Sequence, residues 1–244
     1  MKTLRLTAIA CLLLGAMVSC KKGNGSSQPN SNSTDEAADL VTASLSTSTQ
    51  GALSGTTDIT VSADAKLHID TTCGVTWADS VDRSIPFGQQ YNYSYKAKYT
   101  YTYNCGTSPT VNTTSAYSGS FVTPNLSSTF SGSSDFTIGG VNHQSTTYTI
   151  NGEYKRSGSF QSKTDTSFEG TQNVDITLTN LVLVKPLRII KSGSASFTIS
   201  GDMPKRGSFN YTGTIVFNGG DNATLTVNGQ GYLINLSSRT KKKI

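Results

Sequence analysis

Apolar and polar residues alternate with a period of two over most of the chain that follows residue 56. The clearest runs give each of two segments one apolar face, formed by Ile176, Leu178, Val182 and Val184 and by Phe209, Tyr211, Ile215 and Phe217. Glycine, asparagine and aspartate interrupt the runs at short intervals, as turns between consecutive strands do. The pattern predicts an all-β fold over residues 56–238. We expect a single domain of antiparallel meander strands, roughly eight or more, in a barrel-like or curled two-layer sheet.

The most regular alternation runs from Tyr91 to Tyr103. Every odd position is tyrosine except Ala97, and every even position is polar. A strand here would carry its tyrosines on one face, which suits either a packed core or a surface that binds sugar rings or peptide backbones. Lys96 and Lys98 indicate that the even-numbered face is exposed to solvent, so we predict that the tyrosine face is core. Tyr91 and Tyr103, at the strand ends, are predicted to be partly exposed and are the candidate ligand-binding residues.

One short helix is predicted ahead of the alternating region. Ser33 and Thr34 supply hydroxyls for its start, and apolar residues then recur at helical spacing, at Ala37, Leu40, Val41 and Leu45. We expect the helix to end before Gly51. Residues 21–33 contain no apolar residue except Pro29, which predicts a flexible tether.

A repeat within the β region gives a further expectation. Residues 148–160 resemble residues 197–209, and each copy runs from alternating apolar residues into a glycine, at Gly152 or Gly201. Glycine supplies the positive φ that a tight turn needs. Each copy is therefore predicted to be a strand, a turn at that glycine, and a return strand that begins near its final phenylalanine.

The first twenty residues have a different pattern. A basic start precedes an apolar run from Leu6 to Val18, and Ser19-Cys20 follows. This arrangement resembles a bacterial lipoprotein signal. The resemblance implies that residues 1–19 are removed and that Cys20 becomes a lipidated first residue, carrying fatty acyl chains such as palmitate. An ordinary secretory signal and an uncleaved anchor are the alternatives, although the apolar run is short for crossing a bilayer.

The residue after the cysteine bears on location. Lys21 stands where aspartate retains such lipoproteins in the inner membrane, so the resemblance implies an outer-membrane anchor. The expected partner is therefore the membrane, contacted through the lipid, with the domain in the cell envelope and facing the periplasm. In this organisation residues 20–55 hold the lipidated cysteine, the tether and the short helix.

Two cysteines remain once the signal and Cys20 are accounted for. Cys73 and Cys105 are expected to form a disulfide in the oxidising envelope, with two reduced, buried thiols as the alternative. A metal site is not expected, because these cysteines and the distant His68 and His143 lack any paired ligand spacing. Each histidine is expected to be a separate surface or turn residue.

The charge balance excludes one class of partner. The formal net charge is +5, and part of the excess lies in the signal and in a basic tail at residues 239–244. The folded body is then close to neutral, unlike the concentrated basic face of a nucleic-acid-binding protein. The tail is expected either to be solvated or to touch an anionic membrane surface.

Catalytic motifs are missing from the sequence. It has no nucleophile elbow, phosphate-binding loop, dinucleotide fingerprint or zinc-protease helix, and we expect no cofactor. The sequence predicts a non-catalytic envelope lipoprotein whose β domain binds a glycan, a lipid or an envelope protein, or serves structurally. The alternative is a small β-fold hydrolase, glycosidase-like, that uses paired carboxylates such as Asp165, Glu169 and Asp175.

Overall fold

The computed structural model describes residues 31–85 and 92–244, so Cys20, Tyr91 and most of the expected tether lie outside the described residues. The helices are α1 (Ser31–Leu45), the short 3-10 helix η1 (Thr47–Thr49) and α2 (Ala52–Leu67). The strands are β1 (Thr76–Ile85), β2 (Asn92–Asn104), β3 (Thr110–Val122), β4 (Leu126–Gly139), β5 (Thr147–Ser162), β6 (Glu169–Val184), β7 (Ile189–Met203), β8 (Gly207–Gly219), β9 (Asn222–Val227), β10 (Gln230–Asn235) and β11 (Lys241–Lys243).

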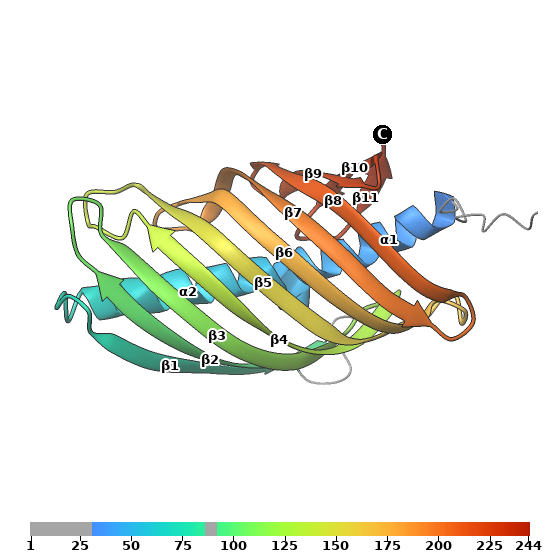
Figure 1. Cartoon of the computed structure of the whole chain (residues 1–244), viewed down its shortest axis with the longest axis horizontal. Helices are drawn as coiled ribbons and strands as arrows, with labels where there is room; N and C mark the ends of the chain where they lie inside the picture. Colours follow the sequence, from blue (N-terminus) through green and yellow to red (C-terminus); the bar gives the residue numbers. More distant parts are fainter. Residues whose placement is uncertain (1–30, 86–91) are drawn as a thin grey trace, which may run out of the picture.

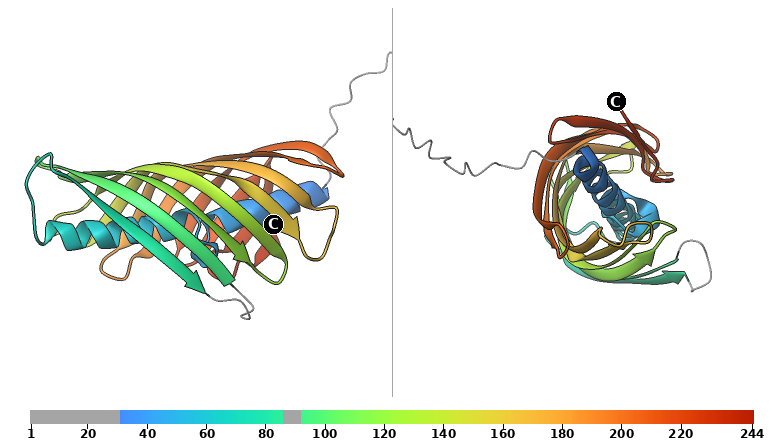
Figure 2. Two further views of the ribbon diagram at one scale, coloured as in Figure 1. Left: turned by 90° about the horizontal axis from the view of Figure 1, so that it is seen from below. Right: turned by 90° about the vertical axis from the view of Figure 1, so that its right-hand side faces the viewer.

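The eleven strands form one antiparallel sheet in sequence order. The sheet curls around α1 and α2, which follow one another along its concave side (Figure 1). Figure 2 shows this wrapping in the end-on view, where the sheet makes an open arc around the helices. β1 and β11 are the two edges, so the sheet is not closed into a barrel. The prediction of an all-β, curled meander is confirmed, and helices form its inner layer.

The prediction of one short helix is incomplete, because α2 follows α1. Residues 56–67, which the alternation assigns to the β domain, are helical, and the first strand begins at Thr76. α2 lacks a broad apolar stripe because most of its buried side consists of small residues: Ala52, Ser54, Gly55, Thr56, Thr60 and Ala63. Small side chains let a helix fit inside a sheet whose concave face carries aromatic rings.

The basic C-terminal segment also differs from the expected tail. Lys241–Lys243 form β11, which pairs with Tyr232–Ile234 of β10. The ammonium group of Lys241 lies 2.7 Å from a carboxylate oxygen of Asp39 in α1. Strand pairing and this ion pair hold the segment against the helix, so the sheet continues beyond residue 238.

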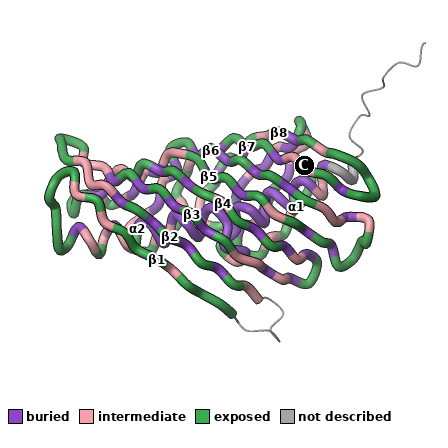
Figure 3. Tube along the Cα trace, turned by 60° about the horizontal axis from the view of Figure 1, so that its bottom comes forward, coloured by how far each residue is buried: buried purple, intermediate pink, exposed green. Residues whose placement is uncertain are grey.

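The tyrosine face of β2 is core, as predicted. Tyr95 and Tyr99 are each 2% exposed and Tyr101 is 1% exposed, while the even-numbered lysines between them face solvent. Figure 3 shows the same alternation of buried and exposed positions along the neighbouring strands. Tyr103, at the end of β2, is partly exposed as expected.

The repeat prediction is wrong for the first copy and correct only in part for the second. β5 runs without a turn from Thr147 to Ser162, and Gly152 lies at a register shift against β6 with a φ of 135°. A Cβ at Gly152 would lie 2.0 Å from the carbonyl oxygen of Asp135, so glycine is required there by a bulge instead of a turn. In the second copy a hairpin does form and Phe209 lies in its return strand β8, as predicted, but Gly201 lies within β7 and the turn is at 204–206.

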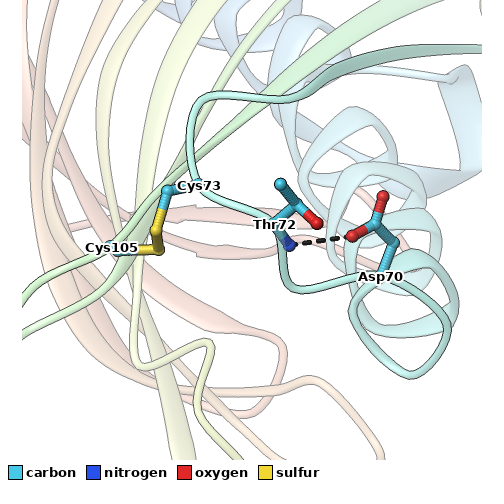
Figure 4. The surroundings of a disulfide bond; sticks show 4 residues. All are labelled: Asp70, Thr72, Cys73 and Cys105. Carbon is cyan, nitrogen blue, oxygen red and sulfur yellow. Dashed lines mark hydrogen bonds between the residues drawn. A yellow bond between two sulfur atoms is a disulfide. The ribbon is translucent and has the colours of Figure 1, made fainter.

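The disulfide between Cys73 and Cys105 is present, with the two Cα atoms 5.5 Å apart. It joins the α2–β1 loop to the β2–β3 loop, as Figure 4 shows. In the same loop the Thr72 N–H donates to the carboxylate of Asp70 at 2.8 Å. Hydrogen bonds from the Thr72 side chain and backbone hold the pKa of Asp70 below its usual value. The loop that leads into β1 is thus fixed at two points.

Candidate functional site

A cavity of about 600 Å³ lies at the rim of the sheet, beside residues 36–43 of α1. Four segments line it: residues 36–43 of α1, 123–126 between β3 and β4, 162–168 between β5 and β6, and 238–241 before β11. We call this cavity the rim pocket. Its walls come from segments far apart in sequence, which the curl of the sheet brings together around α1.

The lining of the rim pocket is rich in hydroxyl groups and includes one side-chain amide. Its polar, uncharged members are Thr123, Asn125, Ser162, Thr164, Ser238 and Thr240, and its apolar members include Pro124, Leu126 and Phe168. Side-chain hydroxyls fix the two turns that carry them. The Thr123 hydroxyl donates to the Leu126 carbonyl at 2.8 Å, and the Ser162 hydroxyl accepts the Asp165 N–H at 3.1 Å.

Ion pairs join α1 to the loops around the rim pocket. One guanidinium nitrogen of Arg206 lies 2.6 and 2.8 Å from the two carboxylate oxygens of Glu36, and the other lies 2.6 Å from Asp165. Hydrogen bonds from Ser167, and then the charge of Arg206, lower the pKa of Asp165. The hydrogen bonds to Glu36 raise the pKa of Arg206. Arg206 therefore joins α1 to the 162–168 loop through its two carboxylate partners.

A buried arginine contacts the same part of α1. Arg156 is 1% exposed, and its guanidinium carbon lies 3.8 Å from the centroid of the Phe130 ring. Its Nη1 donates to the carbonyl of Ala43 at 3.4 Å, in the last turn of α1, where the helix dipole favours a cation. Ala43 also lines the rim pocket, so Arg156 supports that wall from behind.

A second polar cluster lies between α2 and the first two strands. Asp58 of α2 forms an ion pair with Arg83 of β1 and accepts a hydrogen bond from the Tyr99 hydroxyl at 3.3 Å. The hydroxyls of Tyr95 and Tyr99 are 3.2 Å apart. Burial raises the pKa of Asp58 despite Arg83, and burial also raises the pKa values of both tyrosines. The tyrosine rings are enclosed, so this cluster clamps α2 and offers no open ligand surface.

The two histidines meet, although they are far apart in sequence. The ring centroids of His68, at the end of α2, and His143, between β4 and β5, are 4.8 Å apart, and both residues are exposed. Their surface positions agree with the prediction, whereas their pairing was not expected. Among the described residues, no group of three or more histidine, cysteine, aspartate or glutamate side chains is arranged to hold a metal ion.

The residues proposed from the sequence do not gather at one place. Tyr103 lies at the disulfide end of β2 and contributes nothing to the rim pocket. Of the three candidate carboxylates, Asp165 lines the rim pocket, Glu169 pairs with Lys205 at 3.1 Å, and Asp175 is exposed on β6. Sequence analysis missed the contributions of α1 and of Arg206, because no local motif links positions so distant along the chain.

Comparison with known proteins identifies no relative. The chain matches no protein-family model, no curated protein sequence and no solved structure. Among the described residues, no helix combines the length and the apolar character needed to cross a membrane.

Proposed function

We propose that this protein is a lipid-anchored, non-catalytic envelope protein whose β domain binds a glycan in the rim pocket. The observation that carries this proposal is the lining of that pocket. Hydroxyls and an amide stand beside an aromatic ring, and the lining carboxylates of Glu36, Asp39 and Asp165 are paired with Arg206 or Lys241. A neutral, polyhydroxylated ligand matches such a lining, because it exchanges hydrogen bonds with hydroxyls and packs its apolar faces on rings.

The size and the rigidity of the pocket support the same ligand class. A volume of about 600 Å³ falls within the range of small-molecule sites, roughly 300–1,000 Å³. The hydrogen bonds within the loops and the Arg206 ion pairs hold the walls in place, which reduces the entropy lost when a ligand binds.

The charge pattern favours binding over hydrolysis. A glycosidase needs one carboxylic acid whose pKa is raised, so that it can protonate the leaving group. In the rim pocket Asp165 has a lowered pKa, and Glu36 and Asp165 share Arg206. Carboxylates that are paired with an arginine in this way position the walls and accept hydrogen bonds from sugar hydroxyls.

The proposed anchor places the pocket near a membrane. α1 begins at Ser31, and this helix lines the rim pocket from Glu36 onward. A linker of the length between Cys20 and Ser31 spans on the order of 20 Å as a random coil. Lipidation at Cys20 would therefore hold the rim pocket close to the periplasmic side of the outer membrane, where envelope glycans are the abundant polyhydroxylated ligands.

A binding screen with matched variants tests this function. The full-length chain, extracted in detergent, is applied to an array of envelope oligosaccharides and, in parallel, to phospholipid vesicles. We expect a glycan to bind the wild type, and Thr164→Val or Asn125→Ala to weaken it about tenfold, the worth of one lost hydrogen bond. Asn210→Ala, on the exposed face of β8, is the control and should bind normally. Binding by vesicles alone, or equal binding by all variants, would contradict the proposal.

A further inference from the structure

β1 is an edge strand with one side open. Among the described residues it pairs with β2 and with no other strand. The Tyr103 N–H donates to the carbonyl of Val75 at 3.3 Å. Backbone groups alternate in direction along a strand, so the odd-numbered residues of this segment point their N–H and C=O groups toward β2. The Ser80 N–H instead contacts the carboxylate of Asp79 at 2.8 Å. The even-numbered residues of β1 therefore direct their backbone N–H and C=O groups outward, ready for another strand.

We propose that this edge binds a second copy of the chain, by antiparallel pairing of the two β1 strands about a two-fold axis at Val81. In this register Val81 faces Val81 of the partner subunit. Asp79 faces Arg83 of the partner subunit, and the reciprocal pair repeats across the axis. Trp77 likewise faces Ile85 of the partner subunit. The strand is thus complementary to itself in charge and in apolar contact, which an isologous interface requires.

The backbone agrees with the same register. A two-fold axis at Val81 sets Ser80 opposite Asp82 and Ala78 opposite Ser84. These are the even-numbered residues with outward backbone groups, so they form the hydrogen-bonded pairs of the new ladder. A shift of the register by two residues would instead set Asp79 opposite Val81. Neither Asp79 nor Arg83 would then face a residue of opposite charge on the partner strand. The register centred on Val81 is therefore the favoured one.

Side chains near this edge are consistent with a partner that covers it. The Arg83 side chain is 42% exposed although it pairs with Asp58, so its guanidinium has room for a second carboxylate. Val61 of α2 is 49% exposed and Ile85 of β1 is 39% exposed. Val61 stands about 60° around the helix from Asp58, the residue that pairs with Arg83 of β1. No residue of β1 lines the rim pocket, so the interface is independent of the proposed ligand site.

Disulfide crosslinking tests the interface in the full-length chain. At the axis the two Val81 Cα atoms form a non-hydrogen-bonded pair ~4.5 Å apart, within reach of a disulfide. Whole cells that express Val81→Cys are oxidised and examined on non-reducing gels. A band at twice the chain mass is expected, about tenfold stronger than in Val216→Cys, an exposed valine on β8 that serves as the control. Wild-type protein should give no such band.

A second crosslink keeps the test independent of any folding defect at Val81. Ala78→Cys and Ser84→Cys change exposed side chains, and each faces the other across the axis. We expect a dimer when the two variants are expressed together and little when either is expressed alone. The proposal is overturned if neither design yields a dimer, or if Val81→Cys joins a protein of different mass, since the edge would then bind another partner.

Discussion

Truncation of Tyr99 tests how the sheet holds its inner helices. The residue is 2% exposed, and its hydroxyl connects Tyr95 to Asp58 of α2. Tyr99→Ala removes a whole buried ring and should lower the free energy of unfolding by about 3–5 kcal/mol, as aromatic truncations in packed cores do. Tyr99→Phe keeps the ring and removes only the hydroxyl. Its hydrogen bonds are long, at 3.2 and 3.3 Å, so the expected loss is about 1 kcal/mol.

Urea unfolding of the full chain measures both losses. Trp77 is the single tryptophan, and its ring centroid lies 6.1 Å from that of Tyr101, so its fluorescence reports on this part of the core. Tyr103→Ala is the control, because that ring is partly exposed and its removal should cost less. The packing argument is refuted if Tyr95→Ala and Tyr99→Ala both stay within ~0.5 kcal/mol of the wild type.

Three further predictions concern the anchor, the disulfide and a buried carboxylate. Fatty-acid labelling should mark the wild type and not Cys20→Ser, and equal labelling would exclude Cys20 as the lipid site. Replacing Cys73 and Cys105 together by serine should lower the free energy of unfolding by about 3–4 kcal/mol, measured in urea, since the bond closes a long loop; an unchanged midpoint would exclude this stabilisation. Burial raises the pKa of Asp58, so ionisation of this group costs stability as the pH rises from about 4. The stability of the wild type relative to Asp58→Asn should therefore be greater at pH 4 than at pH 7 in urea titrations, and the opposite order would contradict this assignment.

The sheet could be predicted because its strands obey a simple local rule. A strand buried on one face must alternate apolar and polar residues, and β2 does so with tyrosines that are now found in the core. The disulfide followed from the count of cysteines and from the expected oxidising compartment. These inferences need no knowledge of which segments lie side by side.

α2 could not be predicted by the same reasoning. Its buried side includes Gly55, Thr56 and Thr60, which carry no helical signal, and they are buried because the sheet curls around the helix (Figure 2). That requirement comes from the tertiary structure alone. Gly152 is a related case, since the sequence shows the need for glycine but not whether a turn or a bulge causes it.

The rim pocket could not be predicted from the sequence, for a different reason. Arg206 binds Glu36, which is 170 residues away, and Asp165, which is 41 residues away. Such contacts form only after the sheet has curled around α1, and none of the three residues belongs to a recognisable motif. Prediction of the site required the order and the curvature of all the strands.

Hydrogen–deuterium exchange with a bound glycan tests the central claim most directly. The full-length protein is compared with and without the tightest oligosaccharide from the array. The account predicts slower amide exchange at residues 123–126 and 162–168, the loops of the rim pocket, and unchanged exchange in the 219–222 turn between β8 and β9. Slower exchange confined to other parts of the sheet, with the rim-pocket loops unaffected, would contradict it.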